Sequence, residues 1–168
     1  MRNLTYSLEL VNNLLQMKKT VLFLLTIICT TICAYGQNNN EKLYKAIVKS
    51  DTTAVRQLLN DKADPNYIKS AGPWMKVSML ITGIKNIDVV KLLVANKVDV
   101  KWKDGFNTTA LMYAASNGNK EIVTLLLENG ADINDNDGKG NTVLSAAKES
   151  KNQDLIKFIE DKLEGKGK

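Results

Sequence analysis

The chain has no histidine and only two cysteines and two prolines in 168 residues. Without histidine, the Ser–His and Cys–His pairs of nucleophilic enzymes cannot form, and zinc loses its imidazole ligands. Both cysteines, Cys29 and Cys33, lie near the N-terminus, so the remaining residues cannot form a disulfide. The sequence therefore predicts no catalytic residues, no metal site and no cofactor.

Charge of one sign is not concentrated anywhere in the chain. Lys and Arg number 23 against 18 Asp and Glu, a formal net charge of +5, and the two signs alternate along the sequence. A nucleic-acid-binding surface would need a clustered basic stripe, so we expect no nucleic-acid partner. A hydrophobic fraction of 44% with 24% charged residues is typical of a single globular domain and not of a disordered chain.

An apolar segment near the N-terminus has the features of a secretory signal peptide. Lys18 and Lys19 precede an apolar run over residues 21–32, and Ala34 and Gly36 supply small residues before Gln37. This order of basic, apolar and small residues predicts a leader over residues 1–36 that is cleaved after Gly36. We therefore expect the protein to be exported, either to a periplasm or out of the cell.

A membrane anchor is the less favoured interpretation of this segment. Residues 21–35 number 15, which as a helix span roughly 22 Å against a hydrocarbon core of roughly 30 Å. A bacterial lipoprotein would need a small residue just before its cysteine, whereas Cys33 follows Ile32. Met17 is the expected start of translation because residues 1–16 are long for a signal peptide, although Met1 stays open. We expect no stable membrane span once the leader is removed.

Residues 104–136 contain a pattern that recurs along the chain at a spacing of 33. A polar turn leads to Thr109-Ala110-Leu111 and a short helix of small residues, and a Leu-rich helix over residues 120–127 follows. The Leu-rich segment matches residues 87–94, and Thr109-Ala110-Leu111 matches Thr142-Val143-Leu144. Gly130 can end its helix in a left-handed conformation, and Thr109 and Thr142 are expected helix N-caps.

Together these residues resemble the ankyrin-repeat family. The resemblance implies an all-α solenoid of about four helix–turn–helix repeats, in which the terminal repeats act as polar caps. The predicted repeats cover residues 41–66, 67–103, 104–136 and 137–162, after a linker over 37–40 and before a frayed tail over 163–168.

The second repeat is irregular. The interpretation we prefer aligns Ser78-Met79-Leu80 with the family's Thr-Pro-Leu. This requires about four extra residues in the finger loop, around residues 72–76, and two missing residues between Lys85 and Asn86. A plain insertion of two residues also fits the spacing.

Departures from the family pattern affect the finger loops. Met112 and Ser145 stand where the family usually has a histidine that ties neighbouring fingers by hydrogen bonds. Asn107 replaces a usual finger glycine, and asparagine tolerates positive φ better than most residues. We expect the fold to be kept and the fingers to be less tightly tied.

In the family, partners commonly contact the finger tips and the exposed side of the inner helices. Position by position, the resemblance places the partner-binding residues of this chain at Ile68, Lys69, Trp74, Met75, Lys103, Phe106, Thr108, Ser116, Asn117, Asn136, Lys139, Asn141 and Glu149.

Four aromatic residues lie at or near the expected fingers, and their role has two interpretations. Tyr67, Trp74, Trp102 and Phe106 could form an exposed strip that anchors a partner. Alternatively, Trp74 folds back over its own repeat and Trp102 packs against the next finger.

The expected function is non-catalytic protein binding by a monomer in the bacterial cell envelope. Resemblance to exported ankyrin-repeat proteins implies either an inhibitor, such as an immunity protein, or a protector of a co-exported enzyme. The alternative is a structural scaffold of the envelope with several weak partners.

Overall fold

The structure is a computed structural model that describes residues 2–70, 72 and 75–165, with side chains from residues 14–26, 38–70, 72 and 75–165. The chain forms two compact units, Met1–Asn38 and Asn39–Lys168. Trp74 and residues 166–168 of the expected tail lie outside the described residues.

The first unit is entirely helical. Helix α1 (Arg2–Val48) runs through it and continues into the second unit. The apolar side chains described in residues 14–25, such as Leu22 and Phe23, are exposed. Within the described residues, none of the helices has the length and apolar character needed to cross a membrane.

Residues 37–40, for which the sequence predicts a linker, are part of helix α1. Asn39 is buried, and its Nδ2 donates a hydrogen bond to the carbonyl oxygen of Asp61. Asn40 Oδ1 accepts a bond of 2.7 Å from the backbone N–H of Asp64. These contacts make the end of the expected linker part of the first repeat.

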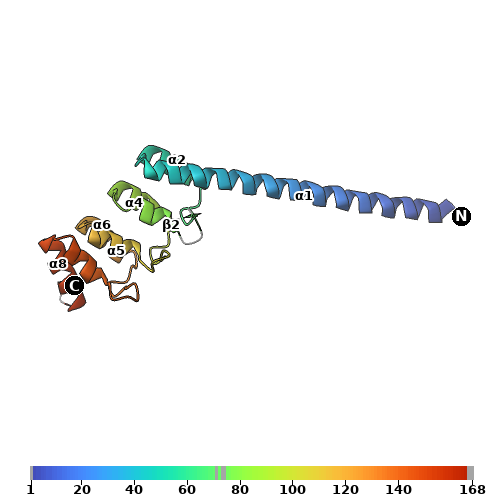
Figure 1. Cartoon of the computed structure of the whole chain (residues 1–168). Helices are drawn as coiled ribbons and strands as arrows, with labels where there is room; N and C mark the ends of the chain where they lie inside the picture. Colours follow the sequence, from blue (N-terminus) through green and yellow to red (C-terminus); the bar gives the residue numbers. More distant parts are fainter. Residues whose placement is uncertain (1, 71, 73–74, 166–168) are drawn as a thin grey trace. The chain divides into compact units, whose positions relative to one another are not determined.

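The second unit is a series of four helix pairs (Figure 1). In each pair a first, inner helix is followed by a second, outer helix in the opposite direction, as the sequence predicts for an all-α solenoid. The pairs are the end of α1 with α2 (Thr52–Asn60), α3 (Met79–Thr82) with α4 (Ile87–Ala95), α5 (Ala110–Ser116) with α6 (Lys120–Glu128), and α7 (Val143–Glu149) with α8 (Gln153–Leu163).

Side-chain N-caps set the start of the helices. Thr109 and Thr142 cap α5 and α7, as the sequence predicts, and Ser78 caps α3 in the same way. The outer helices α4, α6 and α8 are capped by asparagines at a spacing of 33, namely Asn86, Asn119 and Asn152. Each cap satisfies backbone N–H groups that have no partner inside the helix, which stabilises it by about 1 kcal/mol.

A hairpin explains the irregular second repeat. Strands β1 (Ile68–Ser70) and β2 (Lys76–Ser78) pair in antiparallel fashion, with Ile68 opposite Ser78. In the next two repeats the matching bridges join Lys103 to Thr109 and Asn136 to Thr142. The paired residues are ten positions apart in the hairpin and six in the later fingers, so this finger has four extra residues.

The deletion in the second repeat is also confirmed. Ser78 and Asn86, the caps of α3 and α4, are eight positions apart, whereas Thr109 and Asn119 are ten positions apart. Two residues are therefore missing between the helices, and the preferred alignment is correct. The alternative of a plain two-residue insertion is wrong. The sequence reasoning did not predict the strands themselves.

One continuous apolar core runs through the four pairs. Small residues on the inner helices, such as Ala114, Ala115 and Ala147, are fully buried and allow the helices to pack closely. The largest buried side chains come from both helices of the pairs and include Leu43, Ile47, Leu93, Leu111, Ile122, Leu126, Leu155 and Ile159.

The last repeat carries charge where the third repeat carries apolar side chains. Lys148 and Glu160 occupy the positions of Ala115 and Leu127 one repeat earlier. Lys148 Nζ lies 3.6 Å from Glu160 Oε1, and both side chains are largely exposed. An exposed ion pair adds little stability by itself, but its charged groups allow this outer face of the last repeat to be exposed to solvent. This pair gives the fourth repeat the polar character expected of a C-terminal cap.

Candidate partner-binding groove

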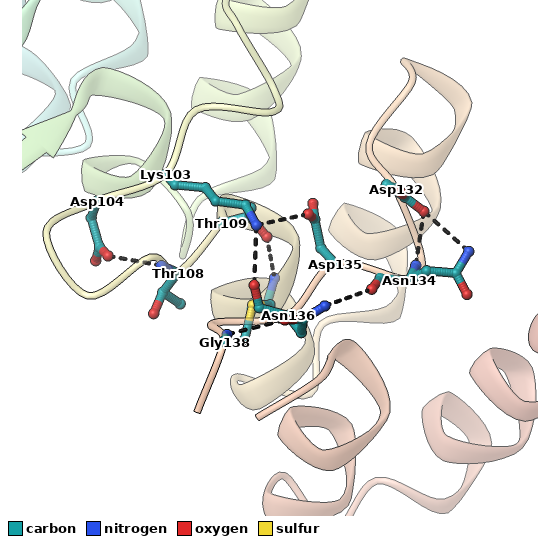
Figure 2. Close-up of polar contacts among 10 residues, drawn as sticks. Lys103, Asp104, Thr108, Thr109, Asp132, Asn134, Asp135, Asn136 and Gly138 are labelled. Atoms are coloured by element: carbon teal, nitrogen blue, oxygen red, sulfur yellow. Dashed lines mark hydrogen bonds and ion pairs between the residues drawn. The ribbon is translucent and has the colours of Figure 1, made fainter. Parts of the chain in front are cut away.

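An aspartate carboxylate shapes each of the last two fingers. Asp104 Oδ1 accepts hydrogen bonds from the backbone N–H groups of Phe106 at 2.8 Å and Thr108 at 2.9 Å. Asp137 Oδ1, one repeat later, accepts from Lys139 at 2.7 Å and Asn141 at 3.0 Å. Because an ionised carboxylate binds two amides of the same turn, each finger has a defined loop conformation. Figure 2 shows the bond between Asp104 and Thr108.

Positive φ angles fall at matching positions in these turns. Asn107 has φ of 62° and Gly140, 33 positions later, has φ of 105°. This left-handed conformation favours glycine and is tolerated by asparagine. The prediction for Asn107 in place of the usual glycine is therefore confirmed.

Lys103 ties the third finger to the fourth. Its Nζ donates a hydrogen bond of 3.0 Å to the carbonyl oxygen of Asn136 and lies 3.2 Å from Asp135 Oδ1 (Figure 2). The expectation of loosely tied fingers is therefore wrong at this junction, because a lysine supplies the link that the missing histidine would make. Lys103 and Asn136, two predicted partner-binding residues, therefore contact each other through the Lys103 ammonium and the Asn136 backbone carbonyl, while Asn136 stays exposed.

A groove lies between these two fingers and the inner helices α5 and α7. It has a cavity volume of about 380 Å³. Six of the thirteen predicted partner-binding residues line it: Phe106, Thr108, Ser116, Lys139, Asn141 and Glu149. The sequence reasoning missed the other lining residues, which are Met112, Tyr113, Asp137, Ser145 and Ala146.

The missed residues form the floor of the groove. Met112 and Ala146 are buried core residues on α5 and α7 that also reach the groove. Tyr113 donates a hydrogen bond of 2.8 Å from its hydroxyl to Asp104 Oδ2. Burial, with the bond to Asp104, raises the pKa of Tyr113 to about 12, so its phenol is neutral at physiological pH. The floor therefore combines the apolar side chains of Met112 and Ala146 with the neutral phenol of Tyr113 and the polar groups of Asp137 and Ser145.

The rim of the groove carries one aromatic ring and two charges. Phe106 is 65% exposed, which is more than any other large apolar side chain described in residues 39–165. Lys139 and Glu149 are exposed as well. Among the described residues, neither Lys139 Nζ nor the Glu149 carboxylate has a hydrogen bond or an ion pair. The rim therefore offers an apolar contact and two exposed charged groups to a partner.

Residues predicted from the second repeat lie apart from this groove. Lys69 Nζ binds both carboxylate oxygens of Glu41, at 2.7 and 2.8 Å, and lies 5.6 Å from the centre of the Tyr44 ring. The hydrogen bonds from Lys69 and then from Tyr67 hold the pKa of Glu41 below its usual range. Lys69 therefore fastens the hairpin to the end of α1. Near the hairpin tip, Met75 is 58% exposed.

The aromatic residues near the fingers differ in their burial and contacts. Tyr67 is half-buried and bonded to Glu41, while Trp102 is half-buried and lines a separate cavity of about 340 Å³ together with Ile68. Trp102 and Phe106 therefore line different cavities and do not form one aromatic strip along the groove. Asn117 is exposed at the C-cap of α5 and does not line the groove.

The Asp137 carboxylate makes the fourth finger sensitive to acid. Hydrogen bonds from the Lys139 amide, and further bonds from Asn141, lower the pKa of Asp137. A carboxylate whose pKa is lower in the folded than in the unfolded protein stabilises the fold at pH values above its unfolded-state pKa. This stabilisation is lost as the pH falls through the pKa of the folded protein. The urea midpoint of the wild-type protein should therefore fall between about pH 5 and pH 2.

Asp137→Asn should reduce this dependence, because the amide keeps an acceptor oxygen but has no charge to lose. Urea unfolding at a series of pH values measures the effect. Asp154→Asn, at an exposed carboxylate in the first turn of α8, is the matched control. Equal pH slopes for wild type and Asp137→Asn would contradict this role.

Comparison with known proteins places these repeats in a family. A family model for ankyrin repeats in three copies matches residues 78–165, which is just over half of the chain. The match covers the last three helix pairs and both finger turns of the groove, while the first helix pair precedes it. No curated protein matches the chain. The helix pairs, their 33-residue spacing and the family match agree: this chain belongs to the ankyrin-repeat family.

Proposed function

We propose that this ankyrin-repeat protein binds another protein in the groove between its third and fourth fingers. Ankyrin repeats are generally protein–protein interaction modules. The observation that carries the proposal is the exposed Phe106 ring beside a cavity of about 380 Å³ whose floor includes the apolar side chains of Met112 and Ala146. Aromatic side chains next to apolar pockets supply much of the binding energy at protein interfaces.

The groove is suited to binding because its loops are already held in place. Asp104 and Asp137 fix the two turns, and Lys103 joins the fingers. A partner then has less loop motion to freeze, so less of the interaction energy is lost to ordering.

Binding is favoured over catalysis by the state of the polar groups in the groove. Asp104 and Asp137 are engaged by amides of their own turns, and the Ser145 hydroxyl is bonded to the backbone of Thr142. Among the described groove residues, no nucleophile lies beside a free base. Ankyrin-repeat proteins are typically non-catalytic, which agrees with this proposal.

We further propose that the protein acts after export in a bacterial cell envelope. The leader pattern in residues 1–36 supports export. The compact repeat unit begins at Asn39, two residues after the expected new N-terminus at Gln37, so cleavage after Gly36 would leave every repeat intact. In this setting the protein inhibits a delivered toxin or protects a co-exported enzyme. A scaffold with several weak partners is the alternative.

Loss of the Phe106 ring should remove most partner binding. Protein produced from the full chain and used as bait in an envelope extract should recover a partner, and Phe106→Ala should weaken its binding by about tenfold or more. Leu163→Ala, which truncates an exposed leucine at the end of α8, should leave recovery unchanged. Equal recovery by all three baits would refute the groove as the binding site.

The stoichiometry of the recovered complex distinguishes an inhibitor or protector from a scaffold. An inhibitor or protector should form a tight one-to-one complex with one protein, whereas a scaffold should recover several proteins weakly.

Removal of the leader should produce a defined N-terminus. When the full chain is expressed in a bacterium, N-terminal sequencing of the product from the envelope fraction should read from Gln37. Ala34→Leu, which replaces the small residue three positions before the expected cut, should cause the longer precursor to accumulate. Retention of residues 17–36 in the wild-type product would contradict export by cleavage.

A further inference from the structure

We infer that the partner presents an apolar side chain with a basic residue on one side and an acidic residue on the other, and that these pair with Glu149 and Lys139. This inference rests on the proposed function, because it specifies which chemistry the same groove accepts. It follows from the position and sign of the two charges that the groove leaves unpaired.

Lys139 and Glu149 lie at opposite ends of the groove. Lys139 is in the fourth finger, before α7 begins at Val143, and Glu149 is the last residue of α7. Both line the same cavity. At 1.5 Å per residue, the helix separates its first and last residues by about 9 Å along its axis. A partner segment that lies along α7 therefore meets positive charge at one end and negative charge at the other.

The other charged groups around the groove are already engaged. Asp104 and Asp137 accept bonds from their own turns, and Lys103 pairs with Asp135. On α7, Lys148 pairs with Glu160 on α8 and so does not neutralise its neighbour Glu149. Asp137 keeps its negative charge near Lys139 but is buried, so Lys139 and Glu149 are the exposed charged groups of the groove that a partner can pair with.

Glu149 creates a preference for a cation at the end of α7. Its exposed carboxylate attracts a basic partner residue and repels an acidic one. Near Lys139 the preference is reversed.

Between these charges, the apolar part of the groove receives the anchor. Phe106 stands at the rim, and Met112 and Ala146 contribute to the floor. A large aliphatic or aromatic side chain can fill this space and displace water from the Phe106 ring. Opposite charges on its two sides fix its direction in the groove, because the reversed orientation would place like charges together.

A randomised peptide library displayed on phage tests this inference and does not require the natural partner. Selection on protein produced from the full chain should enrich peptides with an apolar or aromatic residue between a basic and an acidic residue. Selection on Glu149→Lys should replace the basic residue by an acidic one, and selection on Lys139→Glu should replace the acidic residue by a basic one. Glu128→Lys and Lys157→Glu, at exposed positions on the outer helices, should select the wild-type pattern.

Binding of one synthetic peptide from the wild-type selection gives the quantitative test. Its dissociation constant should rise about tenfold with Glu149→Lys, and a peptide with its basic residue changed to an acidic one should recover the loss. Peptides that lose binding with Phe106→Ala but tolerate Glu149→Lys would overturn this inference and leave the proposed function standing. Failure to select any peptide sensitive to Phe106→Ala would overturn both.

Discussion

The two helices of the third repeat are too short to be stable alone, and they are buried by the repeats on both sides. Leu111 on α5 and Leu126 on α6 have no exposed surface, although each helix has nine residues or fewer. Isolated helices of this length are marginal in water. Stacking is therefore the constraint on which the finger positions and the groove depend.

Because the repeats stack, the proposed binding groove is formed by two copies of the same finger turn. The third and fourth fingers have the same carboxylate-bound turn at a spacing of 33, so two copies of one loop form the two sides of a single groove. The two turns carry different side chains at matching positions, and these differences determine which chemical groups line the groove. Phe106 in one finger corresponds to Lys139 in the next, so an aromatic ring and a charged group at matching positions line the same groove.

The parts of the structure that follow this spacing could be predicted from the sequence. The helix pairs, the caps at Thr109 and Thr142 and the four extra finger residues all follow from aligned positions. The hairpin was missed because its strands have only three residues each, too few for a visible alternation of apolar and polar side chains. The helical state of residues 37–40 was missed because their contacts with Asp61 and Asp64 are more than 20 positions away.

The sequence predicted only part of the groove, because residue spacing does not show which side chains meet in space. Transfer of family positions found its rim, including Phe106 and Glu149, but assigned Met112 and Tyr113 no binding role. A residue of the inner helix can be packed in the core and still form the floor of a groove, and spacing alone does not reveal this. Conversely, the sequence assigned Lys103 and Lys69 to partner binding, whereas the structure shows that they contact Asn136 and Glu41 within the same chain.

Hydrogen exchange at the finger amides tests most directly whether stacking creates a groove that is formed before any partner binds. The amides of Thr108 and Asn141, which bind Asp104 and Asp137, should exchange about as slowly as that of Tyr113 within α5. Exchange of Thr108 and Asn141 at the rate of an unstructured peptide, with Tyr113 still protected, would contradict a preformed groove.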